Sequence, residues 1–234
     1  MSNYRVTVDT GGTFSDFVFF SEDTGEITIT KVPSTPKEPF QAVLNGVKEL
    51  VSQGVAAGNI SFFCHGTTVG TNALLEEKGA KTGLLVTQGF RGIYEVMEQT
   101  RGYGPATYDL FFEKPRLLAP PYLTEEIPER TDFRGNVLKP IDVEASLQAV
   151  RRLKKKNVQS VAVCFLFSFL NPAHELKLKE IFAAEFPEAR LSLSYEVLPQ
   201  IREFYRLSTT VINAYIQPVM AHYLNRLEQC MREM

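Results

Sequence analysis

The start of the chain constrains the fold most, because three segments of strand-like period follow one another with tight turns between them. Residues 4–9 alternate polar and apolar side chains and end in Thr10-Gly11-Gly12-Thr13, and residues 16–20 form a second apolar segment. The turn-forming residues 22–25 lead into residues 26–32, which alternate again. Alternation over this length is typical of half-buried strands. The pattern therefore predicts three antiparallel strands in a meander.

Helical and strand-like segments then follow in turn. Apolar side chains recur at helical spacing over residues 40–51, and the apolar run 60–64 predicts a buried strand. A second helix is expected to end near Lys78-Gly79, where glycine suits a left-handed cap, and residues 82–87 predict a further strand. The order β-β-β-α-β-α-β predicts an α/β fold with a mixed sheet, as in a ribonuclease-H-like lobe, over residues 1–88.

The remainder of the chain divides into three parts. Residues 89–140 predict an irregular Gly/Pro-rich insert with one hairpin turn at 131–137, and residues 141–200 predict a second α/β segment. Residues 201–234 predict a long C-terminal helix that Pro218 kinks or divides. The apolar stripe of this helix runs to its last residues, so we expect an oligomer or a further part of the chain to cover it.

Composition excludes several classes of protein. A hydrophobic fraction of 44% with 22% charged residues argues against disorder, and no apolar run approaches the 18 residues of a membrane span. A net charge of -2 gives no electrostatic footprint for nucleic acid. The first residues lack the pattern of a signal peptide, and we expect buried free thiols at Cys64 and Cys164. These features predict a soluble, cytoplasmic protein.

The first chemical motif is Asp9-Thr10-Gly11-Gly12-Thr13, which lies between two predicted strands and is followed by Asp16. Successive glycines let backbone N–H groups approach an anion with no Cβ in the way. The hydroxyls of Thr10 and Thr13 suit phosphate oxygens, and Asp9 is placed to hold Mg²⁺ directly or through water. The motif predicts a phosphate-binding loop, with Asp9 as metal ligand and catalytic residue and with Asp16 as a further cofactor-binding residue. A tight β-turn with a solvated aspartate is the alternative.

The second motif, residues 64–72, joins the predicted strand 60–64 to a helix. Free N–H groups at a helix start favour an anion or a polarised carbonyl. Thr67, Thr68 and Asn72 are therefore candidates for substrate binding, and His65 is a candidate catalytic base. The alternatives are a plain N-cap at Thr67 or Thr68 and a structural role for His65.

Weaker candidates lie further along the chain. Arg101, in a glycine-rich loop, is a candidate clamp for a carboxylate or phosphate, although a loop arginine is commonly just solvated. The cluster 202–206 is interpreted as a salt-bridged helix start, His174 as a capping group, and His222 as a histidine without partners.

Together these motifs resemble the N-terminal part of the hydantoinase A/5-oxoprolinase proteins. The similar segments cover essentially the whole chain in the family's order: residues 8–16, 65–75, 87–91, 129–135, 161–175 and 208–215. The resemblance implies a member of the actin-like ATPase superfamily, in which two lobes close over ATP and Mg²⁺, with residues 9–13 meeting the phosphates. It also implies ATP-dependent hydrolysis of a cyclic amide such as a hydantoin or 5-oxoproline.

The chain departs from the family pattern in three ways. Ser15 stands where the family usually has threonine, and residues 101–107 replace a usual Arg-Pro-containing segment before Tyr108, which questions the substrate-facing part of the insert. Family members also run far beyond this length, and their second glycine-rich motif lies there. We therefore expect the chain alone to be inactive and to need a second lobe or companion subunit, in a homo- or hetero-oligomer.

Two rival functions stay open. A related subunit with the same phosphate loop would activate a ketone for carboxylation instead of opening a ring. A non-catalytic module would bind a partner through the terminal helix and use the glycine loop only structurally.

Overall fold

The protein folds into two compact units, which share its last helix. The structure, a computed structural model, describes residues 3–35, 38–52, 54–97, 108–111 and 113–233. Unit 1 comprises Met1–Lys78 with Val219–Met234, and unit 2 comprises Gly79–Pro218. Helix α7 (Glu203–Arg232) is continuous through Pro218, so the predicted division of this helix is wrong, but the boundary between the units falls at that proline.

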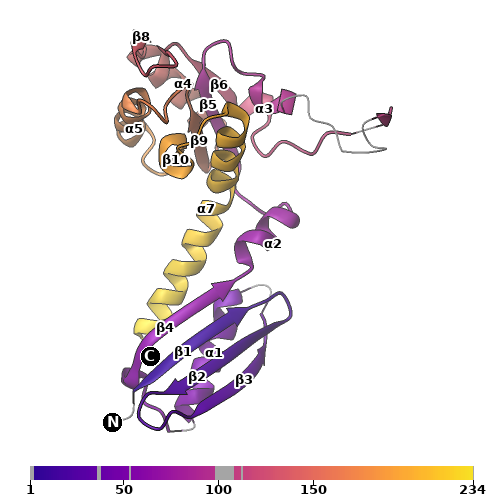
Figure 1. Ribbon diagram of the computed structural model, residues 1–234, viewed down its shortest axis with the longest axis vertical. Coiled ribbons are helices and arrows are strands. Elements are labelled where there is room, and N and C mark those ends of the chain that lie inside the picture. The colour runs from indigo at the N-terminus through magenta and orange to yellow at the C-terminus, as the bar shows by residue number, and fades with distance from the viewer. Residues whose placement is uncertain (1–2, 36–37, 53, 98–107, 112, 234) are drawn as a thin grey trace. The chain divides into compact units, whose positions relative to one another are not determined.

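The sheet of unit 1 contains the predicted meander. Strands β1 (Tyr4–Thr10), β2 (Phe14–Ser21) and β3 (Ile27–Pro33) are antiparallel neighbours. Strand β4 (Ile60–Thr67) pairs in parallel with β1, which gives the strand order β3-β2-β1-β4 (Figure 1). The sheet is therefore mixed, as predicted for this part of the chain.

Two helices cover one face of this sheet. Helix α1 (Pro39–Ser52) and the C-terminal part of α7 pack with β1 and β2 around one core. The core residues are Val6, Val8, Phe17, Phe19, Phe40, Val43, Leu44, Val47, Leu50, Tyr223 and Leu227. The terminal stripe of α7 is thus covered within unit 1 itself, so our reason for expecting an oligomer or a further part of the chain does not hold.

Two predictions around β4 need correction. Because alternate side chains of a strand face opposite sides and the core lies on one face of this sheet, Cys64 of β4 is exposed instead of buried. A short 3₁₀ turn (Ala57–Asn59) precedes this strand. Helix α2 (Val69–Leu75) ends before the predicted glycine cap, and Glu77 takes the left-handed conformation, with φ 55°. In unit 2, Gly79 packs against the ring of Tyr215.

Unit 2 contains a separate parallel sheet of order β10-β9-β5-β6. Its strands are β5 (Thr82–Thr87), β6 (Thr124–Ile127), β9 (Ser160–Cys164) and β10 (Arg190–Leu193). The predicted lobe boundary at residue 88 is therefore misplaced, because β5 pairs with β9 and β6. The predicted insert likewise belongs to unit 2, where it supplies β6.

Helices α4 (Val143–Lys155) and α5 (Ala173–Glu185) pack on the sheet of unit 2, and several short helices and a hairpin lie in the segments that connect its main elements. Helix α4 begins at the predicted N-cap Asp142, whose carboxylate accepts a hydrogen bond from the Ala145 N–H. Helices α5 and α4 share a core with β5 and β9. The smaller elements are α3 (Ile93–Val96), α6 (Ser194–Val197), a 3₁₀ turn (Pro121–Leu123) and the predicted hairpin, β7 (Arg130–Thr131) with β8 (Val137–Lys139).

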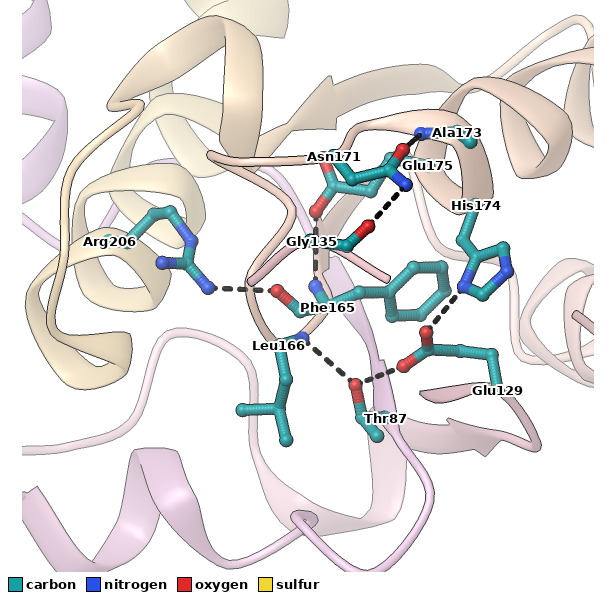
Figure 2. A network of polar contacts seen from close by, with 10 residues as sticks. All are labelled: Thr87, Glu129, Gly135, Phe165, Leu166, Asn171, Ala173, His174, Glu175 and Arg206. Atoms are coloured by element: carbon teal, nitrogen blue, oxygen red, sulfur yellow. Dashed lines mark hydrogen bonds and ion pairs between the residues drawn. The ribbon is translucent and has the colours of Figure 1, made fainter. Parts of the chain in front are cut away.

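A network of buried polar groups follows the ends of β5 and β9 (Figure 2). The His174 imidazole contacts the Glu129 carboxylate at 2.6 Å, and both side chains are buried, so His174 is not the predicted capping group. Glu175 accepts hydrogen bonds from the N–H of Phe165 and the hydroxyl of Ser194.

Arg206 of the same network is fully buried. Its guanidinium donates to the Ser194 hydroxyl and to the carbonyls of Phe165 and Gln200, at 3.2, 2.8 and 3.0 Å. The predicted salt-bridged helix start is therefore wrong for Arg206. None of the helices in the described ranges is long and apolar enough to cross a membrane.

Candidate functional site

The parallel pairing of β1 with β4 brings the two predicted motifs together in unit 1. Both strands end at the same edge of the sheet, where Thr10 lies opposite Thr67. The backbone N–H of Thr68 donates to the Thr10 carbonyl at 3.2 Å, and the Thr68 hydroxyl donates to the same oxygen at 3.3 Å. The glycine loop after β1 and the start of α2 after β4 therefore form one local structure.

Internal hydrogen bonds fix the glycine loop. The Gly11 N–H donates to the Phe14 carbonyl at 2.9 Å. This amide is therefore not free to bind an anion, contrary to the prediction. The Ser34 hydroxyl donates to the Gly11 carbonyl at 2.8 Å. Among the described residues, none accepts a hydrogen bond from the N–H of Gly12, and a Cβ there would lie 4.0 Å from Asn72 Nδ2. Gly12 is thus the glycine whose amide remains open.

A cavity of about 560 Å³ lies beside this loop, and all its walls belong to unit 1. Thr10, Gly11 and Gly12 form one wall, Thr68 and Asn72 at the start of α2 another, and residues 219–226 of α7 a third. The complete lining is Thr10, Gly11, Gly12, Ser34, Thr35, Glu38, Pro39, Phe40, Thr68, Val69, Asn72, Ala73, Glu76, Lys78, Val219, His222, Tyr223 and Arg226. Donor groups from two distant parts of the sequence therefore meet at one hollow.

The predicted acids lie apart from this cavity. Asp9 and Asp16 are opposite one another on β1 and β2, both exposed, and neither lines the cavity. Alternate side chains of a strand face opposite sides, so Asp9 points away from the side of the buried Thr10. Asp16 pairs with Lys31 at 3.1 Å. In the described ranges, no three His, Cys, Asp or Glu side chains lie together as ligands for a metal ion.

His65 lies on β4 behind the cavity wall and contacts the hydroxyl of Tyr223 through Nε2. Its ring is 5.7 Å from the Tyr223 ring, and it does not line the cavity. Burial lowers the pKa of His65, while the Val8 carbonyl and Asp9 act in the opposite direction. Burial also raises the pKa of Tyr223, against the nearby hydroxyls of Thr67 and Thr10. Both groups are therefore neutral near pH 7.

The structure thus gathers some predicted site residues and separates others. Thr10, Gly11, Gly12, Thr68 and Asn72 share the cavity wall. Thr13 directly follows Gly12 and Thr67 directly precedes Thr68 in the sequence, but neither threonine lines the cavity. Arg101 falls outside the described residues.

Sequence reasoning missed Tyr223. Its only signal was a hydroxyl-bearing side chain within the apolar stripe of the last helix, and nothing local to Tyr223 indicated His65 as its partner.

Comparison with known proteins assigns the chain to a family. Residues 5–186 match the model of the hydantoinase/oxoprolinase N-terminal region, so the chain belongs to this family. It is 38% identical to an uncharacterised protein of Methanocaldococcus jannaschii, over 94% of this chain and 32% of the relative.

Two named relatives are also similar. The caprolactamase subunit alpha of Pseudomonas jessenii is 35% identical over 99% of this chain and 34% of its own length. The acetophenone carboxylase gamma subunit of Aromatoleum aromaticum is 32% identical over 92% of this chain and 31% of its own length. The chain therefore spans about a third of the length of these curated relatives.

A solved structure supports the fold. The crystal structure of the ATP-dependent caprolactamase from Pseudomonas jessenii superposes with a TM-score of 0.89 at 34% identity, covering 98% of this chain and 34% of that one. The predicted fold class, α/β with a mixed sheet, a second α/β segment and a long C-terminal helix, is confirmed.

Proposed function

We propose that this chain supplies the phosphate-binding part of an ATP-dependent hydrolase that opens cyclic amides. The observation that carries the proposal is the meeting of the glycine loop with Thr68 and Asn72 at one cavity. Membership of the hydantoinase/oxoprolinase family and similarity to a caprolactamase subunit support the choice of substrate class.

The chemistry explains why such an enzyme would use ATP. Resonance gives the amide C–N bond partial double-bond character, and a five-membered lactam gains little from release of ring strain. When bound, ATP would supply a phosphoryl group to the carbonyl oxygen, which would make the carbonyl carbon a better electrophile for water, so that the ring C–N bond could break and phosphate could leave afterwards. Catalysis of phosphoryl transfer rests on positioning and on neutralisation of charge, which backbone amides and hydroxyls provide.

The described residues fit a phosphate group. The N–H of Gly12 has no acceptor among the described residues, Thr10 and Thr68 line the cavity, and a side chain at Gly12 would extend towards Asn72. Thr13, beside this wall, remains a proposed further hydroxyl donor. The strand order β3-β2-β1-β4, with β1 and β4 parallel, supports a ribonuclease-H-like lobe of the actin-like ATPase type.

A bound Mg²⁺ would be held at Asp9. Magnesium commonly uses one or two carboxylates and completes its shell with waters and substrate phosphates, so the pair Asp9 and Asp16 fits this ion. Asp9 is exposed but does not line the cavity, so it would reach a bound ion only at the outer side of the glycine loop.

The binding part of the proposal is tested on the chain itself. We expect the purified chain to bind ATP in calorimetric titration, and Gly12→Val to weaken binding at least about tenfold, because the added methyl groups occupy the space beside Asn72. Gly58→Val is the matched control, since a Cβ at Gly58 meets no atom within 4 Å. Equal ATP affinity in the two variants would contradict the assigned site.

The reaction is tested on the chain with its companion subunit or second lobe. We expect the chain alone to turn over no lactam, so turnover at an ordinary rate of about 1–10³ s⁻¹ would refute the need for a partner. Similarity to the acetophenone carboxylase subunit favours ketone carboxylation as a second candidate. Assays with lactam and ATP, and with ketone, bicarbonate and ATP, separate the two reactions by their products.

A further inference from the structure

The cavity beside the glycine loop has a wall that the proposed function leaves unused. Helix α7 contributes Val219, His222, Tyr223 and Arg226 to its lining. Their spacing of i, i+3, i+4 and i+7 places them on one face of the helix. The cavity volume of about 560 Å³ lies within the range of about 300–1,000 Å³ that is common for sites of small molecules. The cavity is therefore large enough for a ligand that extends beyond one phosphate group.

The contacts of Arg226 place its charged end at this wall. The guanidinium carbon lies 5.5 Å from the centre of the Phe40 ring, and Phe40 lines the cavity as well. Its Nη1 donates to the side-chain oxygen of Gln229 at 3.1 Å. A guanidinium has several N–H donors, and among the described residues the remaining ones have no acceptor. The ring and the amide thus hold the side chain without neutralising its charge.

The charge of Arg226 is available to a ligand. In the described part of the chain, no carboxylate lies within ion-pair distance of its guanidinium. The other cation of the lining, Lys78, pairs with Glu76 at 2.6 Å. Glu38, the remaining acid of the lining, is exposed, so water and salt screen its charge. Arg226 is therefore the cation of this cavity that an anionic group can use.

Arg226 lies one helical turn beyond the residue of α7 that reaches the end of β1. Tyr223 contacts His65, which is two residues from the end of β4 and therefore lies beside the end of β1. Three residues of an α-helix rise about 4.5 Å along its axis. One anionic group at Gly12 and Thr68 and a second at Arg226 are therefore close enough to belong to a single ligand.

We propose that the cavity binds a polyphosphate chain, with one phosphate at Gly12 and Thr68 and another at Arg226. The inference rests on the proposed function and deepens it, because it makes Arg226 a determinant of specificity for linked phosphates. The planar guanidinium matches the geometry of a phosphate group and can donate two parallel hydrogen bonds to its oxygens. A single phosphate bound at the glycine loop does not reach Arg226 and gains nothing from it.

Binding of inorganic phosphates to the full chain tests the role of Arg226. Chemical-shift titration in magnesium-free buffer compares phosphate with tripolyphosphate. We expect the wild type to bind tripolyphosphate at least about tenfold more tightly, and Arg226→Met to lose about tenfold in this affinity, because hydrogen bonds to a charged group are removed. The affinity for phosphate should change little. Arg226→Lys keeps the charge but not the fork of donors, so its affinity for tripolyphosphate should be intermediate.

Arg5→Met is the matched control. Arg5 is exposed and lies over an aromatic ring, that of Phe62 at 5.8 Å, but it does not line the cavity. This variant should bind tripolyphosphate as the wild type does, and circular dichroism shows that the variants are folded. No binding of tripolyphosphate, equal affinities of the wild type for the two ligands, or a loss in Arg226→Met no larger than in Arg5→Met would each overturn the inference.

The outcome is distinct from that of the proposed function. Binding of ATP that Gly12→Val weakens and Arg226→Met leaves unchanged would count against Arg226 alone. Tripolyphosphate binding that depends on Arg226, in a chain that binds no ATP, would support the inference and count against ATP as the ligand.

Discussion

Replacing the buried Arg206 by methionine should destabilise unit 2 strongly. Methionine keeps most of the apolar stem but removes three donors, and it leaves the carbonyls of Phe165 and Gln200 and the Ser194 hydroxyl without them. Each hydrogen bond to a charged group contributes about 1.5–3 kcal/mol, and relief of the buried charge offsets part of the loss. We therefore expect Arg206→Met to lower the free energy of unfolding by about 3–5 kcal/mol.

Urea unfolding followed by circular dichroism at the helix band measures this change, because the chain contains no tryptophan to report by fluorescence. Arg134→Met is the matched control. Arg134 is exposed in a hairpin loop, so its replacement should change the free energy of unfolding by less than about 0.5 kcal/mol. A loss below about 1 kcal/mol for Arg206→Met would refute the view that the guanidinium stabilises this network.

Three further predictions concern packing, thiol reactivity and pH. Gly46→Ala should cost about 1–3 kcal/mol in thermal or urea unfolding, because a Cβ at Gly46 would lie 2.2 Å from the Phe17 ring; unchanged stability would contradict this packing. Iodoacetamide at pH 8 should label the exposed Cys64 and spare the buried Cys164, because burial raises the pKa of the Cys164 thiol to about 11. Mass spectrometry of the labelled peptides measures this, and equal labelling of the two thiols would contradict the prediction. Burial also raises the pKa of Glu175 above its ordinary value of 4.5. Above that pH the folded chain therefore keeps a proton on Glu175 that the unfolded chain has lost. Stability should therefore fall as the pH rises from about 4.5 to the folded pKa, and a rising stability over that range would contradict the assignment.

The sequence predicted those features of the fold that depend on local pattern. The alternation of residues 4–9 reflects one face on a core and one exposed face. Residues 26–32 also form a strand, but their alternation marks no core face, because Ile27 and Ile29 are exposed and Val32 is the residue that packs against the core. The N-cap at Asp142 and the hairpin at 131–137 were also visible, because caps and turns are set by neighbouring residues. Local pattern could not show which sheet residues 82–87 join, since a buried parallel strand has the same apolar run in either sheet.

The site was predictable to a similar degree. The glycine loop and the start of α2 carry their own signatures, and the parallel pairing of β1 with β4 joins them. The contacts of His65 with Tyr223, and of Glu129 with His174, join residues far apart in the chain. Nothing in the spacing of such residues indicates their partner, because only the tertiary fold brings them together.

The shared helix α7 has a consequence for the order in which the chain acquires structure during synthesis. The core of unit 2 uses only residues 79–218, whereas the core of unit 1 needs Tyr223 and Leu227 in addition to β1, β2 and α1. A ribosome releases the amino-terminal strands first, yet they lack part of their hydrophobic cover until the last helix emerges. The middle of the chain should therefore become resistant to proteases before its beginning does.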